Sequence, residues 1–361
     1  MRAHMSKIIT LVVIAGVLVL AVVVSTRYLP ERPQPPEQQL PSAVVTLGDS
    51  TLSGEGGGNY EPGTNGENGN WCHRSPAAAV HQLRLPAGVT PINLACSGAR
   101  AEQVGANPAP GHPEMSQSKR LAELAHRYRI TDVVVQIGAN DDPGFGDVVF
   151  RCLEAWAGRS ATGCEGQMRA EWPERVERMK PKVLAALHDV RTAMDSAGYA
   201  PDSYSLVVQS YASPVAPEVV PALQNLSGCP FLTQDMAWIR DTGVQELSDG
   251  LREVADQVGA RFLDLSQAGR GHEACTDPGR TAENEWFTRL TVDWQGTKED
   301  ENRAPHAMQE SFHANAAGHA QFGRCLGEFL ASEAPAASCR ADERGNLRAV
   351  TSDVAAQGAH P

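Results

Sequence analysis

Two residues at opposite ends of this sequence have the types needed to attack a carbonyl group. Ser50 closes the tripeptide Gly48-Asp49-Ser50, and His313 lies near the C-terminus in Phe312-His313-Ala314. Acyl transfer needs a nucleophile, a base that takes its proton, a group that orients the base, and hydrogen-bond donors for the oxyanion. The sequence therefore predicts Ser50 as nucleophile and His313 as its base.

The orienting group and the oxyanion donors have candidates as well. Gly98 lacks a Cβ, so its backbone N–H lies open to a substrate. Asn140 offers its side-chain NH₂, and the backbone N–H of Ser50 is the third donor for an oxyanion hole. Glu310 precedes His313 by three residues and is expected to hold its other ring nitrogen.

Each of these signals has a plainer explanation when taken alone. Gly-Asp-Ser and Asn-Asp are common turn sequences, and most histidines are surface residues.

A metal hydrolase is the alternative function for the histidines, with ligands among His272, His306, His313 and His319. His313 and His319 are six residues apart, and neither has the i, i+4 partner of a helical zinc motif. We therefore expect no catalytic metal.

The hydrophobic pattern indicates the elements that would bring these residues together. Short β-branched segments alternate with longer amphipathic ones, which is typical of a parallel sheet covered by helices. Ser50, Gly98 and Asn140 each follow a predicted strand, where α/β sheets build their sites. The predicted strands are 43–47, 90–95, 132–137, 205–209 and 261–265. The predicted helices are 75–85, 117–128, 174–197, 233–258 and 316–330.

These elements predict one doubly wound domain over residues 42–340. The polar segments 55–70 and 276–310 are too long for plain connections and are expected to be loops over the active site, or mobile insertions. Residues 341–361, after the last cysteine, are expected to form a disordered tail.

The N-terminus has the features of an export signal. Residues 8–24 are apolar apart from Thr10, and Arg2 and Lys7 precede them. Basic residues before an apolar segment favour an N-in orientation, which places the remaining chain outside the cytoplasm. We assign 1–27 as a membrane anchor or a cleaved signal sequence. A buried core helix is disfavoured because a Pro-rich linker, 28–41, follows at once.

Charge and cysteine content narrow the functional classes. The net charge is −12 without any cluster of Lys and Arg, which argues against nucleic acid or an anionic membrane surface as partner. Membrane contact is expected through the N-terminal segment only.

The eight cysteines lack the C-x-x-C form of zinc or redox sites. Their spacing suggests local pairs, although spacing alone leaves the connectivity open: Cys72 with Cys96, Cys152 with Cys164, Cys229 with Cys275, and Cys325 with Cys339.

The order of the motifs resembles the SGNH (GDSL) hydrolase superfamily. Block I of that superfamily matches residues 47–56, block II matches Gly98, block III matches 138–141, and block V matches 310–319. The surrounding sequence, such as Trp-Cys-His-Arg-Ser at 71–75, is similar to the disulfide-containing extracellular lipases and esterases of actinobacteria. The resemblance covers about residues 43–330.

The resemblance implies a flavodoxin-like three-layer α/β/α sandwich with a five-stranded parallel sheet. It also implies carboxylic ester hydrolysis without a cofactor, and the four cysteine pairs given above. The superfamily usually has Asp where this chain has Glu310, and some relatives orient the histidine with a main-chain carbonyl, so both arrangements stay open here. Asp49 and Asp141 are expected to be scaffold residues that fix loop geometry.

Three functions fit these expectations. The leading one is hydrolysis of a carboxylic ester, either an acyl lipid or an O-acylated glycan, through an acyl-Ser50 intermediate. The second is transfer of the acyl group onto a sugar hydroxyl of the cell envelope. The third, a non-catalytic binding module, is disfavoured because all four chemical positions are present.

Overall fold

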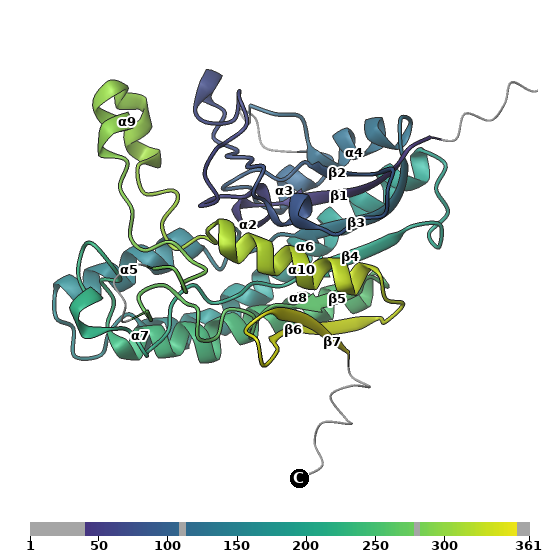
Figure 1. Cartoon of the computed structure of the whole chain (residues 1–361). Coiled ribbons are helices and arrows are strands. Elements are labelled where there is room, and N and C mark those ends of the chain that lie inside the picture. Colours follow the sequence, from purple (N-terminus) through teal and green to yellow (C-terminus); the bar gives the residue numbers. More distant parts are fainter. Residues whose placement is uncertain (1–39, 108–112, 278–281, 352–361) are drawn as a thin grey trace, which may run out of the picture. The chain divides into compact units, whose positions relative to one another are not determined.

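A single β-sheet lies at the centre of the computed structural model, which describes residues 40–107, 113–277 and 282–351 (Figure 1). In these residues the sheet has seven strands in the order β2-β1-β3-β4-β5-β6-β7. Strands β1 to β6 are parallel, and β7 is antiparallel to β6. The strands are β1 Ser42–Gly48, β2 Val89–Asn93, β3 Arg129–Gln136, β4 Ser205–Gln209, β5 Arg261–Asp264, β6 Ala336–Ala341 and β7 Leu347–Thr351.

The predicted α/β sandwich is confirmed, and all five predicted strands are present. Their order, β2-β1-β3-β4-β5, is the flavodoxin-like order. The central strands are apolar because helices cover the sheet on both faces and leave no side of a strand in water. Val133, Val134 and Val135 of β3, for example, are all fully buried.

The predicted number of five strands is too low, and the predicted disordered tail is wrong for residues 341–351. Strand β7 pairs with β6 along its length, and its first residue, Leu347, is fully buried. A turn closed by the Gly345 N–H on the Asp342 carbonyl joins the two strands. The domain therefore extends past residue 340. Residues 352–361 lie outside the described residues.

Helices cover the sheet in two layers (Figure 1). Helices α3 Ala101–Val104, α4 Gln117–Ala125, α6 Glu165–Ser196 and α8 Val244–Gln257 pack together on one face. Helix α10 Ala316–Leu330 packs on the other face beside a 3₁₀ turn, Ala79–Gln82. The remaining α-helices are α2 Ser50–Ser53, α5 Phe145–Ala157, α7 Thr233–Trp238 and α9 Trp294–Glu299.

Two predicted helices differ from the structure. The helix predicted over 75–85 is only the 3₁₀ turn Ala79–Gln82, which ends because the backbone of Leu83 is extended, with φ −64° and ψ 137°. Helix α6 begins nine residues before the predicted start at 174 and continues through Pro173. Its first turns bury Met168 and Trp172 in the core, so tertiary packing outweighs the unfavourable proline.

The helix predicted over 233–258 is interrupted by one π-helical turn. Helix α7 passes through this turn, Ile239–Gly243, directly into α8. The Gly243 carbonyl, at the end of this turn, accepts a hydrogen bond from Trp172 Nε1 at 3.0 Å. Single π turns of this kind are frequent at functional sites.

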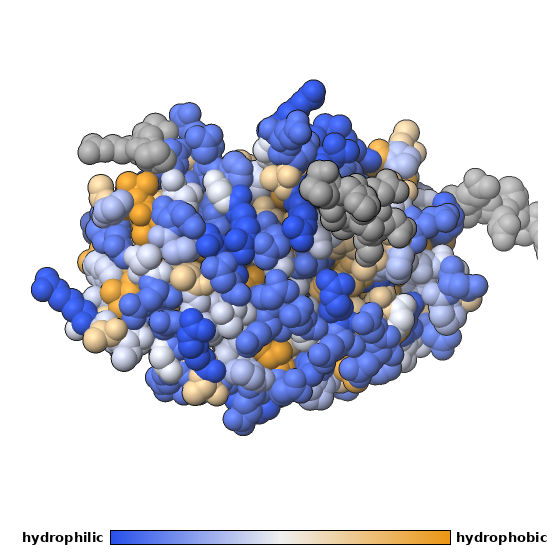
Figure 2. All heavy atoms as spheres, turned by 90° about the horizontal axis from the view of Figure 1, so that it is seen from below, coloured by the Kyte–Doolittle hydropathy of each residue, from blue (hydrophilic) through white to orange (hydrophobic). Residues whose placement is uncertain are grey.

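No helix among the described residues is both long and apolar enough to cross a membrane. The apolar segment 8–24, predicted as an anchor or signal, and the linker before residue 40 lie outside those residues. A compact unit begins at Pro41. The face in Figure 2 is mostly hydrophilic, with its hydrophobic side chains in small separate patches, as expected for an acidic chain.

Candidate active site

Ser50 is positioned by a tightly held turn at the end of β1. Gly48 has φ +145°, and a Cβ there would lie 2.0 Å from the Gln136 carbonyl oxygen of β3, so only glycine fits. The Gln117 side chain bonds the Gly48 backbone twice, accepting from its N–H at 2.7 Å and donating to its carbonyl at 2.8 Å. Ser50 then begins helix α2.

Asp49 and Asp141 fix the loops around Ser50, as scaffold residues would. Asp49 caps α2 by accepting from the Thr51 N–H at 3.1 Å, and Tyr211 donates to it at 2.5 Å. Asp141 accepts from the N–H of Ala101, at the start of α3. Burial raises the pKa of each carboxyl to about 6, although these hydrogen bonds act in the opposite direction.

The structure brings Ser50 and His313 together from positions 263 residues apart. Ser50 Oγ lies 2.8 Å from His313 Nε2. His313 Nδ1 lies 3.2 Å from the carbonyl oxygen of Ser311. Because a carbonyl only accepts, Nδ1 carries the hydrogen of the neutral ring, and Nε2 is left to accept from the serine.

The backbone at Phe312 makes the contact between Ser311 and His313 feasible. Phe312 has φ +61°, an uncommon conformation for a bulky residue. This left-handed residue folds the Ser311 carbonyl back toward the ring two positions later. The buried Phe312 ring packs against Phe231, with ring centroids 4.9 Å apart, and holds the turn.

The prediction that Glu310 orients His313 is wrong in this structure. The Glu310 carboxylate accepts from the Tyr60 hydroxyl at 2.7 Å, and the Ser311 carbonyl lies at His313 Nδ1 instead. The turn at Phe312 is the reason, since it directs a main-chain oxygen to the position that an acidic side chain would fill.

Gly98 follows β2 and Asn140 follows β3, the two strands that flank β1. Gly98 is exposed, with φ +75° and no atom near the position of a Cβ. The Asn140 amide donates to the Ala99 carbonyl at 3.1 Å, which fixes its orientation and leaves its second N–H. Asn140 lines one cavity with Ser50 and a neighbouring polar groove with Gly98. Asn140 therefore shares a cavity wall with Ser50, and Gly98 lies in the adjoining groove.

An apolar cavity opens beside the Ser50–His313 pair. It extends between α5, α6, the α7–α8 region and α10, and Ser50, Asn140 and His313 lie in its wall. The remaining lining is mainly aliphatic and aromatic. The aromatic residues include Phe145, Trp172, Phe231, Trp238, Phe287 and Phe312. Such a lining suits a hydrocarbon chain.

Burial sets the proton affinity of His313. The pKa of His313 is lowered from its usual value because partial burial disfavours the charged ring. The negative charge of Glu55 and the carbonyls of Ser311 and Gln309 oppose this effect without overcoming it. The ring is therefore neutral at neutral pH and can act as a base.

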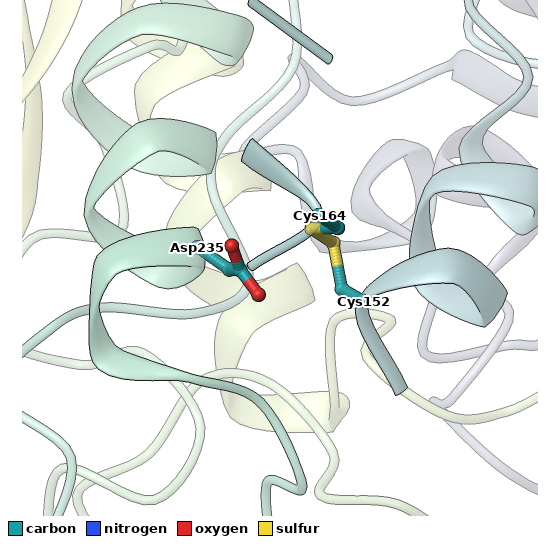
Figure 3. Close-up of side chains that lie close together, drawn as sticks. All are labelled: Cys152, Cys164 and Asp235. Carbon is teal, nitrogen blue, oxygen red and sulfur yellow. A yellow bond between two sulfur atoms is a disulfide. The ribbon is translucent and has the colours of Figure 1, made fainter. Parts of the chain in front are cut away.

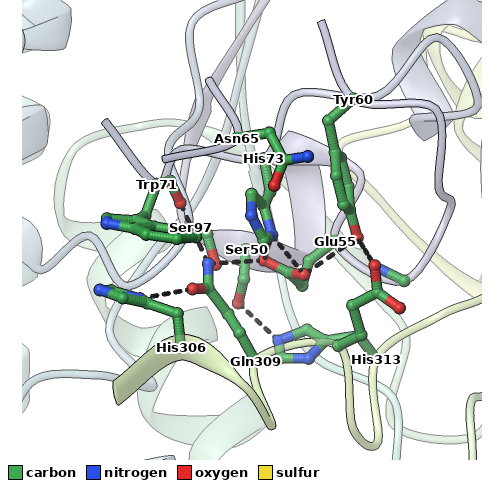
Figure 4. A network of polar contacts seen from close by, with 12 residues as sticks. Ser50, Glu55, Tyr60, Asn65, Trp71, His73, Ser97, His306, Gln309 and His313 are labelled. Atoms are coloured by element: carbon green, nitrogen blue, oxygen red, sulfur yellow. Dashed lines mark hydrogen bonds and ion pairs between the residues drawn. The ribbon is translucent and has the colours of Figure 1, made fainter. Parts of the chain in front are cut away.

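A polar network behind His313 contains the residues that sequence reasoning missed (Figure 4). Its centre is the fully buried Glu55, which pairs with His73 and contacts Gln309. The long segments 55–70 and 276–310 therefore meet at the site, as predicted. Glu55 follows Ser50 by five residues in a glycine-rich sequence, where an acidic residue normally indicates a solvated loop, so no sequence signal marks it as buried.

One group of three potential metal ligands is present in the described residues: Cys152, Cys164 and Asp235 (Figure 3). The two sulfur atoms are bonded to each other, so neither is a thiolate. The Asp235 carboxylate accepts from the Glu165 N–H at 2.9 Å at the start of α6. We interpret the group as a disulfide beside a helix cap.

All four predicted cysteine pairs are present as disulfides: Cys72–Cys96, Cys152–Cys164, Cys229–Cys275 and Cys325–Cys339. Bridges of this number indicate an oxidising compartment.

Residues 46–321 match the GDSL-like Lipase/Acylhydrolase family. The chain belongs to this family. Among GDSL-like proteins, Lipase 2 of Streptomyces coelicolor is 24% identical over 249 residues, which cover 68% of this chain and 77% of the relative. Membership supports ester hydrolysis as the general activity.

Two solved structures are similar to this GDSL-like chain. An extracellular lipase from Streptomyces rimosus has 21% identity and a TM-score of 0.48, and the match covers 77% of this chain and 94% of the lipase. Phospholipase A1 from Streptomyces albidoflavus has 23% identity and the same TM-score of 0.48, with coverage of 80% and 96%.

Proposed function

We propose that the chain hydrolyses carboxylic esters through an acyl-enzyme intermediate on Ser50. The observation that carries this proposal is the 2.8 Å contact between Ser50 Oγ and His313 Nε2 at an apolar cavity. A serine hydroxyl is a weak nucleophile until a neighbouring base takes its proton, and this contact supplies that base.

The proposed reaction has two halves. His313 takes the proton of Ser50 as the oxygen attacks the ester carbonyl, and the oxyanion is received by the N–H groups of Ser50, Gly98 and Asn140. The tetrahedral intermediate collapses, and His313 gives its proton to the leaving alcohol. Water then attacks the acyl-serine by the same route and releases the acid.

His313 is proposed to work without a carboxylate on its ring. The Ser311 carbonyl, 3.2 Å from Nδ1, holds the tautomer in which Nε2 faces Ser50. Orientation and tautomer control are the functions that the acid of a Ser-His-Asp triad also performs.

The cavity favours an ester whose acyl part is a hydrocarbon chain rather than an acetyl group. Its wall beside Ser50 is apolar, and each buried methylene stabilises the complex by about 0.8 kcal/mol. With p-nitrophenyl esters, kcat/KM should rise from acetate to medium-chain esters. A flat or falling series would contradict this assignment of the cavity.

We also propose that the enzyme acts outside the cytoplasm. The four disulfides and the apolar segment 8–24 after Arg2 and Lys7 support this location.

The test of the proposed function is Ser50→Ala. Loss of the nucleophile should lower kcat by about 10⁴- to 10⁶-fold, while circular dichroism and melting temperature stay as in the wild type. A fluorophosphonate should label the wild type at Ser50 and leave the variant unlabelled. Near-normal turnover in the variant would exclude the mechanism.

A further inference from the structure

Glu55 is a buried acidic residue that the proposed reaction does not use. Its side chain is 0% exposed, and it lies just after helix α2, which begins with Ser50. Its N–H donates to the Ser50 carbonyl at 3.2 Å, and its own carbonyl accepts from His319 Nε2 at 3.2 Å. Helices α2 and α10 therefore hold the backbone of Glu55 against the site.

The Glu55 carboxylate is surrounded by donors (Figure 4). His73 Nδ1 lies 2.8 and 2.9 Å from its two oxygens, and Gln309 Nε2 donates at 2.8 Å. Burial raises the pKa of Glu55, but hydrogen bonds from His73 and Ser97 and the positive charge of nearby histidines outweigh it. The pKa therefore lies below its usual value. The buried carboxylate is an anion at neutral pH.

Glu55 is connected to the segment that carries His313, residues 309–313. Gln309 bonds Glu55 directly, and the Tyr60 hydroxyl lies 3.1 Å from Glu55 while donating to Glu310 at 2.7 Å. Hydrogen bonds thus connect two consecutive residues of the segment to Glu55: Gln309 directly, and Glu310 through Tyr60. The Gln309 carbonyl in turn stabilises the protonated His313 ring, which raises the pKa of His313.

The charge of Glu55 also reaches the His313 ring itself. Among the titratable groups around His313, Glu55 stabilises the protonated ring, whereas His73 opposes it. His319 is neutral at the pH of the reaction, because burial lowers its pKa to about 4. His313 must become positive in each half of the reaction, and its Nδ1 partner is an uncharged carbonyl.

We propose that Glu55 is the positioning acid of this site: it holds the 309–313 segment and supplies the negative charge that stabilises protonated His313. The inference rests on the proposed function, in which His313 is the base. It gives Glu55 the electrostatic role that the sequence suggested for Glu310. The competing explanation is that Glu55 and His73 only close the 55–73 loop.

The two explanations differ in the pH profile of Glu55→Gln. Replacing an anion with an amide of the same shape removes a charge that favours imidazolium, so the pKa of His313 falls. The acid limb of kcat/KM against pH should move down by about one unit. The plateau kcat should fall about tenfold or more, with KM little changed. A purely structural residue would lower activity without moving the limb.

Glu310→Gln is the matched control. It makes the same change to the second carboxylate beside Tyr60, and the Glu310 carboxylate is not among the groups that shift the pKa of His313. Its acid limb should coincide with that of the wild type. Equal shifts in both variants would overturn the proposal.

Histidine titration by NMR separates this inference from the proposed function. In ¹⁵N-histidine protein, the pKa of His313 should be lower in Glu55→Gln than in the wild type, whether or not any ester is hydrolysed. An unmoved His313 titration in an active, Ser50-dependent enzyme would overturn the inference and leave the proposed function standing. If the wild type hydrolyses no ester but Glu55→Gln still lowers the pKa of His313, the proposed function fails and the inference stands.

A second variant covers the case in which Glu55→Gln does not fold. Gln309→Met keeps the anion and removes the donor that links it to the segment. The kcat should fall about tenfold, while the acid limb stays within about 0.3 unit of the wild type because the charge remains. Unchanged kcat in a folded Gln309→Met protein would contradict the positioning role.

Discussion

At the scale of single residues, the proposed base, His313, is oriented by a main-chain carbonyl and not by a carboxylate. The left-handed Phe312 directs the Ser311 carbonyl to His313 Nδ1. A carbonyl fixes the ring but has no net charge. Burial therefore dominates the proton affinity of His313, and its pKa is lowered.

The first consequence concerns Glu310. Glu310→Gln should lower kcat by less than about tenfold, because the variant still accepts a hydrogen bond from Tyr60 and the Ser311 carbonyl still orients the ring. Steady-state rates on a p-nitrophenyl ester measure this. A loss of about 10³ or more, as tautomer control by a carboxylate would give, is the contrary result.

The second consequence concerns pH. His313 acts as a base only when neutral, so kcat/KM should rise with pH through its pKa and then level off. Because that pKa is lowered from 6.5, the midpoint should lie below pH 6.5. Exhaustive dialysis against EDTA should leave the profile unchanged. Activity lost on chelation and restored by zinc alone would refute serine catalysis.

Ser50, Gly98 and Asn140 could be proposed from the sequence because each follows a strand in a short, characteristic motif. His313 could be proposed from its motif as well. Glu310 was misjudged because a spacing of three residues does not show which way the chain turns between them, and the turn depends on the dihedral angles of Phe312.

At the scale of elements, the π turn between α7 and α8 shapes the cavity. Trp172 donates to the Gly243 carbonyl at the end of this turn, and the Trp172 and Trp238 rings meet edge to face at 5.5 Å. Both rings line the cavity. Among the described residues, the Trp238 Nε1 has no hydrogen-bond partner.

This difference between two neighbouring tryptophans can be measured. Trp172→Phe removes the hydrogen bond to the Gly243 carbonyl and should lower the free energy of unfolding by about 0.5–1.5 kcal/mol more than Trp238→Phe. The second variant loses a similar volume without losing a hydrogen bond. Denaturant unfolding of both proteins gives the comparison, and equal losses would show that the bond at Gly243 adds nothing.

The first five parallel strands were predictable because buried strands of this kind are rich in β-branched residues. Strand β6 is also parallel but was missed, because Ala336–Ala341 contains no β-branched residue. Strand β7 was not predictable, since four of its five residues remain partly or fully exposed and its pattern resembles a tail. The π turn has no sequence signal either.

At the scale of the whole molecule, four disulfides connect segments that the sheet alone does not hold. Cys325–Cys339 joins α10 to β6, and Cys229–Cys275 joins two loops 46 residues apart. Each bridge is expected to stabilise the fold by about 2–4 kcal/mol.

Thiol titration tests this arrangement directly. The unreduced, denatured protein should contain essentially no reactive thiol, because the eight cysteines form four pairs. The same protein after reduction should give about eight thiols per chain. Two or more thiols before reduction would contradict the assignment.

Formation of the disulfide Cys72–Cys96 is expected to affect activity, because this bridge lies beside two residues that bond Glu55. Cys72 precedes His73, the partner of Glu55, and Cys96 precedes Ser97, which also bonds Glu55. The same covalent bond therefore braces both supports of the buried anion. A newly made chain in a reducing compartment lacks this brace and is expected to have little activity. With the proposed location outside the cytoplasm, oxidation of this bridge would be the step that activates the proposed esterase.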